Sequence, residues 1–424
     1  MHNGVSQVKS KNIGFISVRL AGTDGVSLET AKWADVFEKK GFSCFYCAGE
    51  LDRPAEKSYF IEEAHFNHPD IKDIYRNCFG VTVRGRFITQ RIHSIKRKIK
   101  DDIYRFIEKF NIDILIPQNA LTIPLNIPLG IAITEIISEI GIPTIAHHHD
   151  FFWERQHFLT NSVWEFLNMA FPPHLSSIKH VVINSSADSQ LGLRTGISST
   201  IIPNVMDFEN IPPRPDHYAS DVRKTLGIKD DELFILQPTR VVKRKGIEHA
   251  IELVSRLGMK AKLVISHASG DEGYDYEQRV KAYSRMLNVD TILVSEIIKE
   301  RRGLTSSGDK IYTLDDIYPH ADLVTYPSNF EGFGNAFLEA IYFRKPIVVN
   351  NYSIYSSDIK PKGFSVVEID GYVTDEAVEQ TRNVLRNQSI RKKMTDHNYE
   401  VAKRYFSYSV LRRKLKNLID DFIE

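Results

Sequence analysis

Short apolar segments alternate with amphipathic segments along most of this chain, and this alternation limits the folds open to it. It appears in "NIGFISV" (12–18), "LETAKWADVFEKKG" (28–41) and "FSCFYCAG" (42–49), and again in "LFILQPT" (233–239), "GIEHAIELVSRLG" (246–258) and "AKLVISH" (261–267). The apolar runs have the length of buried strands, and the amphipathic segments have the spacing of helices. The pattern predicts βαβ units, in which helices cover a parallel sheet.

A proline-rich stretch divides the pattern into two series. The chain has 424 residues, more than one hydrophobic core usually holds, and "NIPPRPDHY" occupies residues 210–218. We therefore predict two α/β domains, residues 1–208 and 209–395, with a cleft between them. Ligands of parallel sheets bind beyond the carboxyl ends of the strands, so the loops that follow the predicted strands are the first candidates for function.

Charge and cysteine content indicate an ordinary soluble protein. The formal net charge is +1, which gives no overall field that favours nucleic acid. Three cysteines, Cys44, Cys47 and Cys78, are too few for a disulfide framework and indicate a reducing compartment. Cys44 and Cys47 lie on a predicted strand and face opposite ways, which favours packed thiols over a redox pair.

No membrane span or signal peptide is evident. The longest apolar region, residues 121–146, is interrupted by Glu135 and Glu139, which favours a buried helix near residues 127–140 over a bilayer span. The N-terminal residues are polar, and the apolar run that follows them is too short for a signal sequence. We expect a cytoplasmic protein.

The segment "PSNFEGFGNAFLEA" (327–340) has the features of a ligand-binding loop. It follows the predicted strand "ADLVTYP" and precedes a predicted helix. Gly332 and Gly334 permit a sharp turn and let a ligand approach the backbone closely. The helix start near Asn335 presents unpaired N–H groups, which suit a phosphate.

Two acidic and two basic side chains accompany these turns. Glu339 lies one turn into the helix, where repulsion from phosphate makes a neutral diol such as ribose its better partner. Glu331, before the turn, can reach another part of the ligand, such as sugar hydroxyls. Arg240 and Lys245 follow a different predicted strand, and two cations there suit a diphosphate that gains charge as it leaves. A solvated basic loop is the alternative for that pair.

These motifs resemble those of retaining glycosyltransferases of family 4, which have the GT-B fold. The resemblance rests on "R-x4-K-G" at 240–246 and "E-x7-E" at 331–339, and extends to "GTDGVS" (22–27), to His149 with Asp150, and to "IIPNVMD" (201–207). Two positions depart from the family pattern. Gly22 and Gly25 are separated rather than paired, and Val205 stands where the family commonly has glycine.

The resemblance implies a fold and a set of site residues. The fold would be two Rossmann-like domains that face a cleft, with a helix over residues 396–424 packing back on the first domain. In the roles that the resemblance implies, Arg240 and Lys245 bind the donor diphosphate, Glu331 holds donor-sugar hydroxyls, and Glu339 binds ribose. The main chain would contact sugar and phosphate at Phe333, Gly334, Asn335 and Ala336. Gly25 would lie close to the phosphates, and His149 would contact the transferred sugar near its reacting carbon.

Three other features have simpler interpretations. His147, His148 and His149 alternate sides on a predicted strand, so they cannot all bind one metal ion. "GFG" (332–334) lacks the third glycine of a dinucleotide fingerprint, which argues against NAD. The basic amphipathic segment 91–110 is expected to cover the first sheet, with contact to anionic lipid as the alternative.

The expected activity is transfer of a hexose from a UDP- or GDP-linked sugar to a hydroxyl of a small-molecule, saccharide or lipid-linked acceptor, with retention at the anomeric carbon. No metal and no further cofactor is expected, because Arg240, Lys245 and the helix start supply positive charge and the chain contains no D-x-D. A disaccharide phosphorylase or trehalose-type synthase, a nucleotide-sugar epimerase and a lectin-like subunit are the alternatives. The base, the hexose, the acceptor and the oligomeric state stay open, and lipid contact through 91–110 would place the protein peripherally on the inner membrane face.

Overall fold

The computed structural model describes residues 11–22, 24–268 and 275–423, which form two compact units. Unit 1 comprises the chain up to Pro203 together with the chain from Leu411 onwards, and unit 2 comprises Asn204–Val410. The units therefore divide after Pro203 and after Val410, whereas the sequence placed the domain limits after residues 208 and 395.

Unit 1 contains a seven-stranded sheet in which every neighbouring pair is parallel. Its strands are β1 (Asn12–Ile16), β2 (Ser43–Ala48), β3 (Ser58–Phe60), β4 (Ile114–Pro117), β5 (Thr144–His148), β6 (Ile178–Val182) and β7 (Ser199–Ile201). Their order is β3-β2-β1-β4-β5-β6-β7. The strand order reverses between β1 and β4, so the loops that leave their carboxyl ends diverge there.

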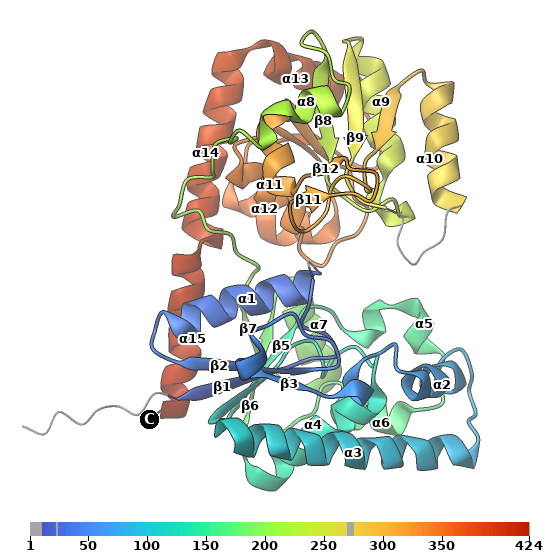
Figure 1. Cartoon of the computed structure of the whole chain (residues 1–424), viewed down its shortest axis with the longest axis vertical. Coiled ribbons are helices and arrows are strands. Elements are labelled where there is room, and N and C mark those ends of the chain that lie inside the picture. The colour runs from blue at the N-terminus through green and yellow to red at the C-terminus, as the bar shows by residue number, and fades with distance from the viewer. Residues whose placement is uncertain (1–10, 23, 269–274, 424) are drawn as a thin grey trace, which may run out of the picture. The chain divides into compact units, whose positions relative to one another are not determined.

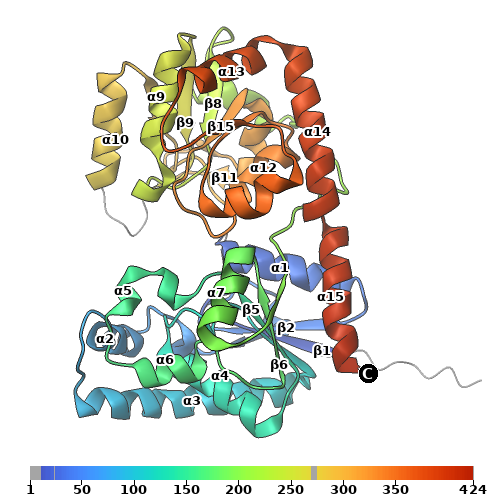
Figure 2. The same ribbon diagram turned by 180° about the vertical axis from the view of Figure 1, so that it is seen from behind.

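Helices cover both faces of this sheet. They are α1 (Gly25–Glu38), α2 (Pro69–Cys78), α3 (Arg86–Phe110), α4 (Ile127–Ile140), α5 (Gln156–Leu159), α6 (Trp164–Ala170), α7 (Ser185–Thr195) and α15 (Tyr408–Ile423). Figures 1 and 2 show α3, α4 and α6 on one face and α1, α7 and α15 on the other. The first group shares one continuous apolar core with the sheet.

Unit 2 contains a six-stranded parallel sheet. Its strands are β8 (Leu233–Gln237), β9 (Ala261–Ile265), β10 (Asp290–Leu293), β13 (Leu323–Tyr326), β14 (Ile347–Asn350) and β15 (Val367–Ile369), in the order β10-β9-β8-β13-β14-β15. A short antiparallel pair, β11 (Gly303–Leu304) and β12 (Lys310–Ile311), follows β10. The helices are α8 (Val222–Thr225), α9 (Ile247–Leu257), α10 (Asp275–Met286), α11 (Leu314–Ile317), α12 (Asn335–Tyr342), α13 (Asp375–Arg386) and α14 (Gln388–Phe406).

The basic segment 91–110 lies within α3, which begins earlier, at Arg86 after the N-cap Gly85. Its apolar side chains recur at helical spacing and are buried, which places that face of α3 in the core of unit 1. On its polar side, the amines of Lys96 and Lys100 each lie 2.8 Å from a carboxylate oxygen of Glu135 on α4. In the described part of the chain, no helix combines the length and apolar character that crossing a membrane requires.

The helix expected over residues 396–424 is interrupted. Ser407 adopts an extended backbone conformation (φ −91°, ψ 167°) and separates α14 from α15. The main-chain N–H of Met206 donates to the carbonyl oxygen of Phe406 (2.8 Å), and Met206 pairs with Ser407 as an isolated parallel bridge. Ser407 thus pairs with a segment that is distant in the sequence. Because this pairing requires an extended backbone, α14 ends before Ser407.

Replacing Ile99 with Ala should destabilise the protein, because Ile99 is fully buried on the apolar face of α3. The lost packing and the cavity should lower the free energy of unfolding by about 3 kcal/mol. Gln90→Ala is the matched control, since Gln90 is exposed on the same helix, and it should change that free energy by less than ~0.5 kcal/mol. Equilibrium denaturant unfolding measures both variants. Equal effects would show that the apolar face of α3 does not stabilise unit 1.

Candidate active site

The two motif loops follow neighbouring strands at the centre of the second sheet. β8 precedes Arg240 and Lys245, and β13 precedes Glu331. β8 and β13 are paired, and the strand order reverses between them. Loops at such a reversal diverge and leave a crevice that binds ligands in parallel α/β sheets. The fold therefore brings together two motifs that lie far apart in the sequence.

The two loops are joined directly by a main-chain hydrogen bond and by a side-chain hydrogen bond to the main chain. The N–H of Asn329 donates to the carbonyl oxygen of Arg244 (2.8 Å), and Nη1 of Arg244 donates to the carbonyl oxygen of Phe330 (3.2 Å). Gly246 has a φ of +57°, and a Cβ at this position would overlap the carbonyl oxygen of Pro327. Glycine is needed here both for the left-handed backbone and for the close approach of the second loop.

An ion-pair cluster fixes the charged side chains of these loops. Glu331 is 8% exposed, and its Oε1 pairs with the amine of Lys245, which is also 8% exposed. Its Oε2 lies 3.0 Å from Nη1 of Arg244. Burial favours the neutral form of Glu331, but the charges of Lys245 and Arg244 outweigh burial and hold its pKa below the usual value. Glu331 is therefore an ionised acceptor of hydrogen bonds inside the loop.

The turn before α12 is shaped for close approach to the backbone. Gly334 has a φ of +119°, and a side chain there would press against the hydroxyl of Tyr352, which itself donates to the carbonyl oxygen of Phe333 (2.8 Å). Gly334 offers no side chain to cap α12. The main-chain N–H groups of Asn335 and Ala336 make no hydrogen bond within the described residues. These two groups, at the positive end of the helix, can receive an anion.

Glu339 lies one turn along α12 and is held by a tyrosine that the sequence analysis did not single out. The hydroxyl of Tyr318, which is fully buried, donates to Oε2 of Glu339 (2.8 Å). The ring of Tyr318 stacks on Phe343, with centroids 5.0 Å apart and planes 5° from parallel. The carboxylate of Glu339 is thus oriented from the protein side, and the residue remains half-buried.

Arg240 is exposed, and its side chain makes no hydrogen bond or ion pair within the part of the chain that the structure describes. His267, after β9, adds a third strand end to this region. Burial lowers the pKa of His267, and the positive charges of Arg240 and Lys245 lower it further. The three side chains therefore interact electrostatically. Oγ of Ser266 lies 2.6 Å from Nδ1 of His267.

Sequence reasoning missed several members of this site. Arg244 lies inside the quoted motif, but nothing in its spacing shows that it pairs with Glu331. Tyr318 and Tyr352 give no local signal, because each acts through a contact made across the fold. Asn204 could have been suspected from "IIPNVMD", and its Nδ2 donates to Oδ1 of Asn335 (2.7 Å) at the start of α12.

In unit 1, Gly25 is the first residue of α1, directly after the N-cap Asp24. Oδ1 of Asp24 accepts hydrogen bonds from the N–H groups of Val26 (3.1 Å) and Ser27 (3.2 Å), so this helix start already carries a carboxylate. Thr23, within the glycine-containing loop of the sequence analysis, lies outside the described residues.

The three consecutive histidines separate as a strand requires. Nε2 of His148 lies 2.9 Å from Nδ1 of His180 on β6. The ring centroids of His147 and His149 lie 4.4 Å apart, on the opposite side of the strand from His148. Burial lowers the pKa of His149 to about 4, although Asp150 acts in the opposite direction. Nε2 of His149 is buried and makes no hydrogen bond within the described residues. Within the same residues, no three His, Cys, Asp or Glu side chains are grouped so as to hold a metal ion.

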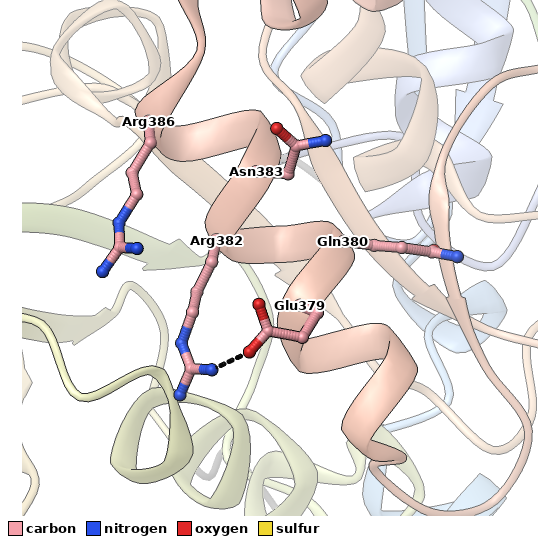
Figure 3. Close-up of a pocket in the computed structure, with 5 residues that line it drawn as sticks. All are labelled: Glu379, Gln380, Arg382, Asn383 and Arg386. Carbon is pink, nitrogen blue, oxygen red and sulfur yellow. Dashed lines mark hydrogen bonds and ion pairs between the residues drawn. The ribbon is translucent and has the colours of Figure 1, made fainter.

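A surface pocket lies apart from both motif loops. Figure 3 shows that α13 alone lines it, through Glu379, Gln380, Arg382, Asn383 and Arg386. Arg382 and Glu379 pair with each other across one turn of the helix. None of the five residues belongs to a motif loop, and we assign no function to this pocket.

Comparison with known proteins identifies the family. Residues 219–401 match the family model described as glycosyl transferases group 1. A mannosylglucosylglycerate synthase of Thermotoga maritima is 30% identical, and the match covers 93% of this chain and 96% of the relative. The chain belongs to the glycosyl transferases group 1 family. A mannosylglucosylglycerate synthase of Petrotoga mobilis is 32% identical to this glycosyltransferase, over 84% of the chain and 86% of the relative.

Solved structures of low sequence identity show the fold of this glycosyltransferase. A glycosyltransferase of Rickettsia africae has a TM-score of 0.68 at 13% identity, covering 98% of this chain and 99% of that one. The protein HepE of Anabaena, solved with UDP and glucose, has a TM-score of 0.63 at 13% identity, covering 97% and 100%. These likenesses confirm the predicted GT-B class with two Rossmann-like parallel sheets.

Two glycines at the ends of α9 offer a matched test of how the motif loops of this glycosyltransferase are joined. Gly246 (φ +57°) precedes α9 and Gly258 (φ +60°) follows it, but an added Cβ meets Pro327 only at Gly246 and open space at Gly258. Gly258→Ala should cost about 1–2 kcal/mol of stability from backbone strain alone. Gly246→Ala should cost about 2 kcal/mol more, because it also forces the loops apart.

Equilibrium unfolding measures the stability of both variants, and calorimetry measures their affinity for a nucleoside diphosphate. Gly246→Ala should weaken nucleotide binding, whereas Gly258→Ala should leave it unchanged. Equal stability and equal affinity in the two variants would contradict the close docking of the loops.

Proposed function

We propose that this glycosyltransferase moves a mannosyl unit from a nucleotide diphosphate sugar to a hydroxyl of glucosylglycerate, with retention at the anomeric carbon and without a metal ion. The observation that carries the proposal is the junction of the two motif loops, which gathers Arg240, Lys245 and the open N–H groups of Asn335 and Ala336 at one strand reversal. The choice of substrates follows the name of two long relatives, mannosylglucosylglycerate synthase.

The donor diphosphate is assigned to the cationic part of the site. Arg240 has an exposed guanidinium whose donors are not used within the described residues, and its planar fork suits phosphate oxygens. Lys245 is buried, and burial lowers its pKa although the charge of Glu331 acts in the opposite direction; its amine adds positive charge close by. The N-terminus of α12 adds main-chain N–H groups. Together these groups neutralise charge that develops on the diphosphate as it leaves.

The two glutamates are assigned to hydroxyl groups. Glu331 is held ionised by Lys245 and Arg244, so its oxygens accept hydrogen bonds from the hydroxyls of the donor sugar. Glu339, oriented by Tyr318, accepts from the ribose hydroxyls. A neutral diol is the better partner for a carboxylate that lies one turn from the phosphate-binding end of a helix.

The proposed chemical step needs no protein nucleophile. The bond between the anomeric carbon and the diphosphate oxygen breaks, and the acceptor oxygen bonds to the same face of that carbon. The proton of the acceptor hydroxyl moves to a diphosphate oxygen, which becomes more basic as the bond breaks. His149 is assigned to the transferred sugar. With a pKa of about 4 it is neutral near pH 7 and so acts as a hydrogen-bonding group rather than a cation.

The test is a transfer assay with glucosylglycerate as acceptor and either UDP-mannose or GDP-mannose as donor. We expect a mannosylated product whose anomeric configuration, read by NMR, equals that of the donor. We also expect the rate to survive EDTA, because side chains and helix N–H groups supply the positive charge.

Four outcomes would each remove a part of the proposal. An inverted product would exclude the same-face step. Loss of activity with EDTA, restored by a divalent ion, would exclude metal-free transfer. Conversion of the donor without acceptor would indicate an epimerase, and phosphate-dependent release of a sugar 1-phosphate would indicate a phosphorylase.

A further inference from the structure

Asn119 adopts an uncommon backbone conformation at the carboxyl end of β4. Its φ is +55°, in the left-handed region that non-glycine residues seldom occupy. Asparagine tolerates this region better than most residues, but the conformation persists only where the surroundings hold it. The main-chain N–H of Asn119 donates to the carbonyl oxygen of His147 (2.9 Å), which joins the ends of β4 and β5.

The side chain of Asn119 uses both its acceptor and its donor. Oδ1 accepts hydrogen bonds from the main-chain N–H of His149 (3.0 Å) and from Oγ1 of Thr122 (2.8 Å). Nδ2 donates to Oδ1 of Asp150 (2.9 Å). Asp150 in turn accepts from Nε of Arg155 at its other oxygen (2.7 Å). One side chain therefore holds the two residues that follow β5.

Gln118, the residue before Asn119, holds the end of β5 through the ring of His147. Oε1 of Gln118 lies 2.8 Å from Nδ1 of His147, whose ring also stacks on Trp33 with centroids 4.2 Å apart. Gln118 thus fixes the ring of His147, and Asn119 fixes the main chain of His149. The imidazole of His149 lies against the ring of His147, so its position depends on both contacts.

We propose that Asn119 is a positioning residue for hexosyl transfer, acting through His149; the inference rests on the proposed function of that histidine. Two requirements select asparagine. The backbone must be left-handed, and the side chain must offer an acceptor to His149 and a donor to Asp150. Glycine meets only the first requirement, and aspartate lacks the donor.

Asn119→Gly separates these requirements, because it keeps the left-handed backbone and removes the side-chain hydrogen bonds. The chain supplies matched controls in Asn111→Gly and Asn288→Gly. Asn111 (φ +48°) and Asn288 (φ +53°) have the same backbone conformation, and their side chains make no hydrogen bond within the described residues. All three substitutions relieve the same strain, but only one releases His149.

Thr122→Val provides a second variant that preserves side-chain shape. It removes the hydrogen bonds that Oγ1 of Thr122 donates to Oδ1 (2.8 Å) and to the carbonyl oxygen (3.3 Å) of Asn119, and it leaves the bond from His149 in place. It therefore loosens Asn119 while keeping the asparagine side chain, and it keeps the inference testable if Asn119→Gly does not fold.

The experiment measures kcat, acceptor KM and donor affinity together with amide hydrogen exchange at His149. Asn119→Gly should speed exchange at that amide and lower kcat about 10- to 100-fold, as expected when a reacting group is misplaced. Thr122→Val should lower kcat about threefold, because Asn119 loses the hydrogen bonds from one supporting hydroxyl. Donor affinity should be unchanged in both variants, and the two control variants should stay within about twofold of wild type in kcat.

A double variant then shows whether Asn119 acts through the histidine. Asn119→Gly combined with His149→Ala should have the kcat of His149→Ala alone to within about twofold, because the histidine that Asn119 positions is absent. Multiplicative losses in the double variant would overturn the inference. So would a normal kcat in Asn119→Gly, whether or not amide exchange rises.

The proposed function and this inference fail in different ways. Kinetics are measured with whichever donor and acceptor the wild-type enzyme turns over, so absence of mannosyl transfer to glucosylglycerate counts against the proposed substrates alone. A normal kcat in His149→Ala would remove His149 from the reaction and overturn the inference with it. A slow His149→Ala together with a normal Asn119→Gly would overturn only the positioning role.

Discussion

The buried contact between Glu331 and Lys245 joins the loops that follow β8 and β13, and the candidate donor site depends on it. An ion pair of this kind adds little net stability, because burying two charges costs about as much as their attraction returns. Its effect is on geometry. The ion pairs of Lys245 and Arg244 with Glu331 fix the loop before α12 against the loop after β8. Gly246 permits the close approach of the two loops that this arrangement requires.

The same contact accounts for the charge distribution of the site. The negative charge of Glu331 offsets part of the positive charge of Lys245 and Arg244, whereas Arg240 has no partner within the described residues. Positive potential is therefore concentrated at Arg240 and at the uncapped start of α12, where a diphosphate is proposed to bind. Glu331 keeps lone pairs for hydroxyl groups and is unavailable as a proton carrier near neutral pH, because its pKa is lowered.

Sequence patterns predicted the local elements well where a single segment contains the whole signal. Apolar spacing and the cap residues Asn126 and Gly141 define α4, which spans the predicted 127–140. Gly334 followed by Asn335 likewise marks the start of α12, because this signal also lies within one segment. The motif spacing also led to the GT-B family before any contact was known. Each of these signals lies within one segment of the sequence, so it can be recognised without knowledge of the fold.

The remaining features arise from contacts between distant segments, which periodicity cannot reveal. Arg244 meets Glu331 only because β8 and β13 are neighbours, and that adjacency is a property of sheet order. Tyr318 reaches Glu339 for a similar reason. The break at Ser407 was missed because the helical pattern continues through it, while pairing with Met206 decides the backbone. Asn119 gave no signal, since its conformation follows from the ends of two strands.

The most direct test of the central claim is a crystal structure of the enzyme with a bound nucleoside diphosphate. The account predicts that the diphosphate oxygens contact Arg240, Lys245 and the N–H groups at the start of α12, with the ribose hydroxyls on Glu339. A nucleotide bound elsewhere on unit 2, with Arg240 and the start of α12 still exposed to solvent, would contradict the account.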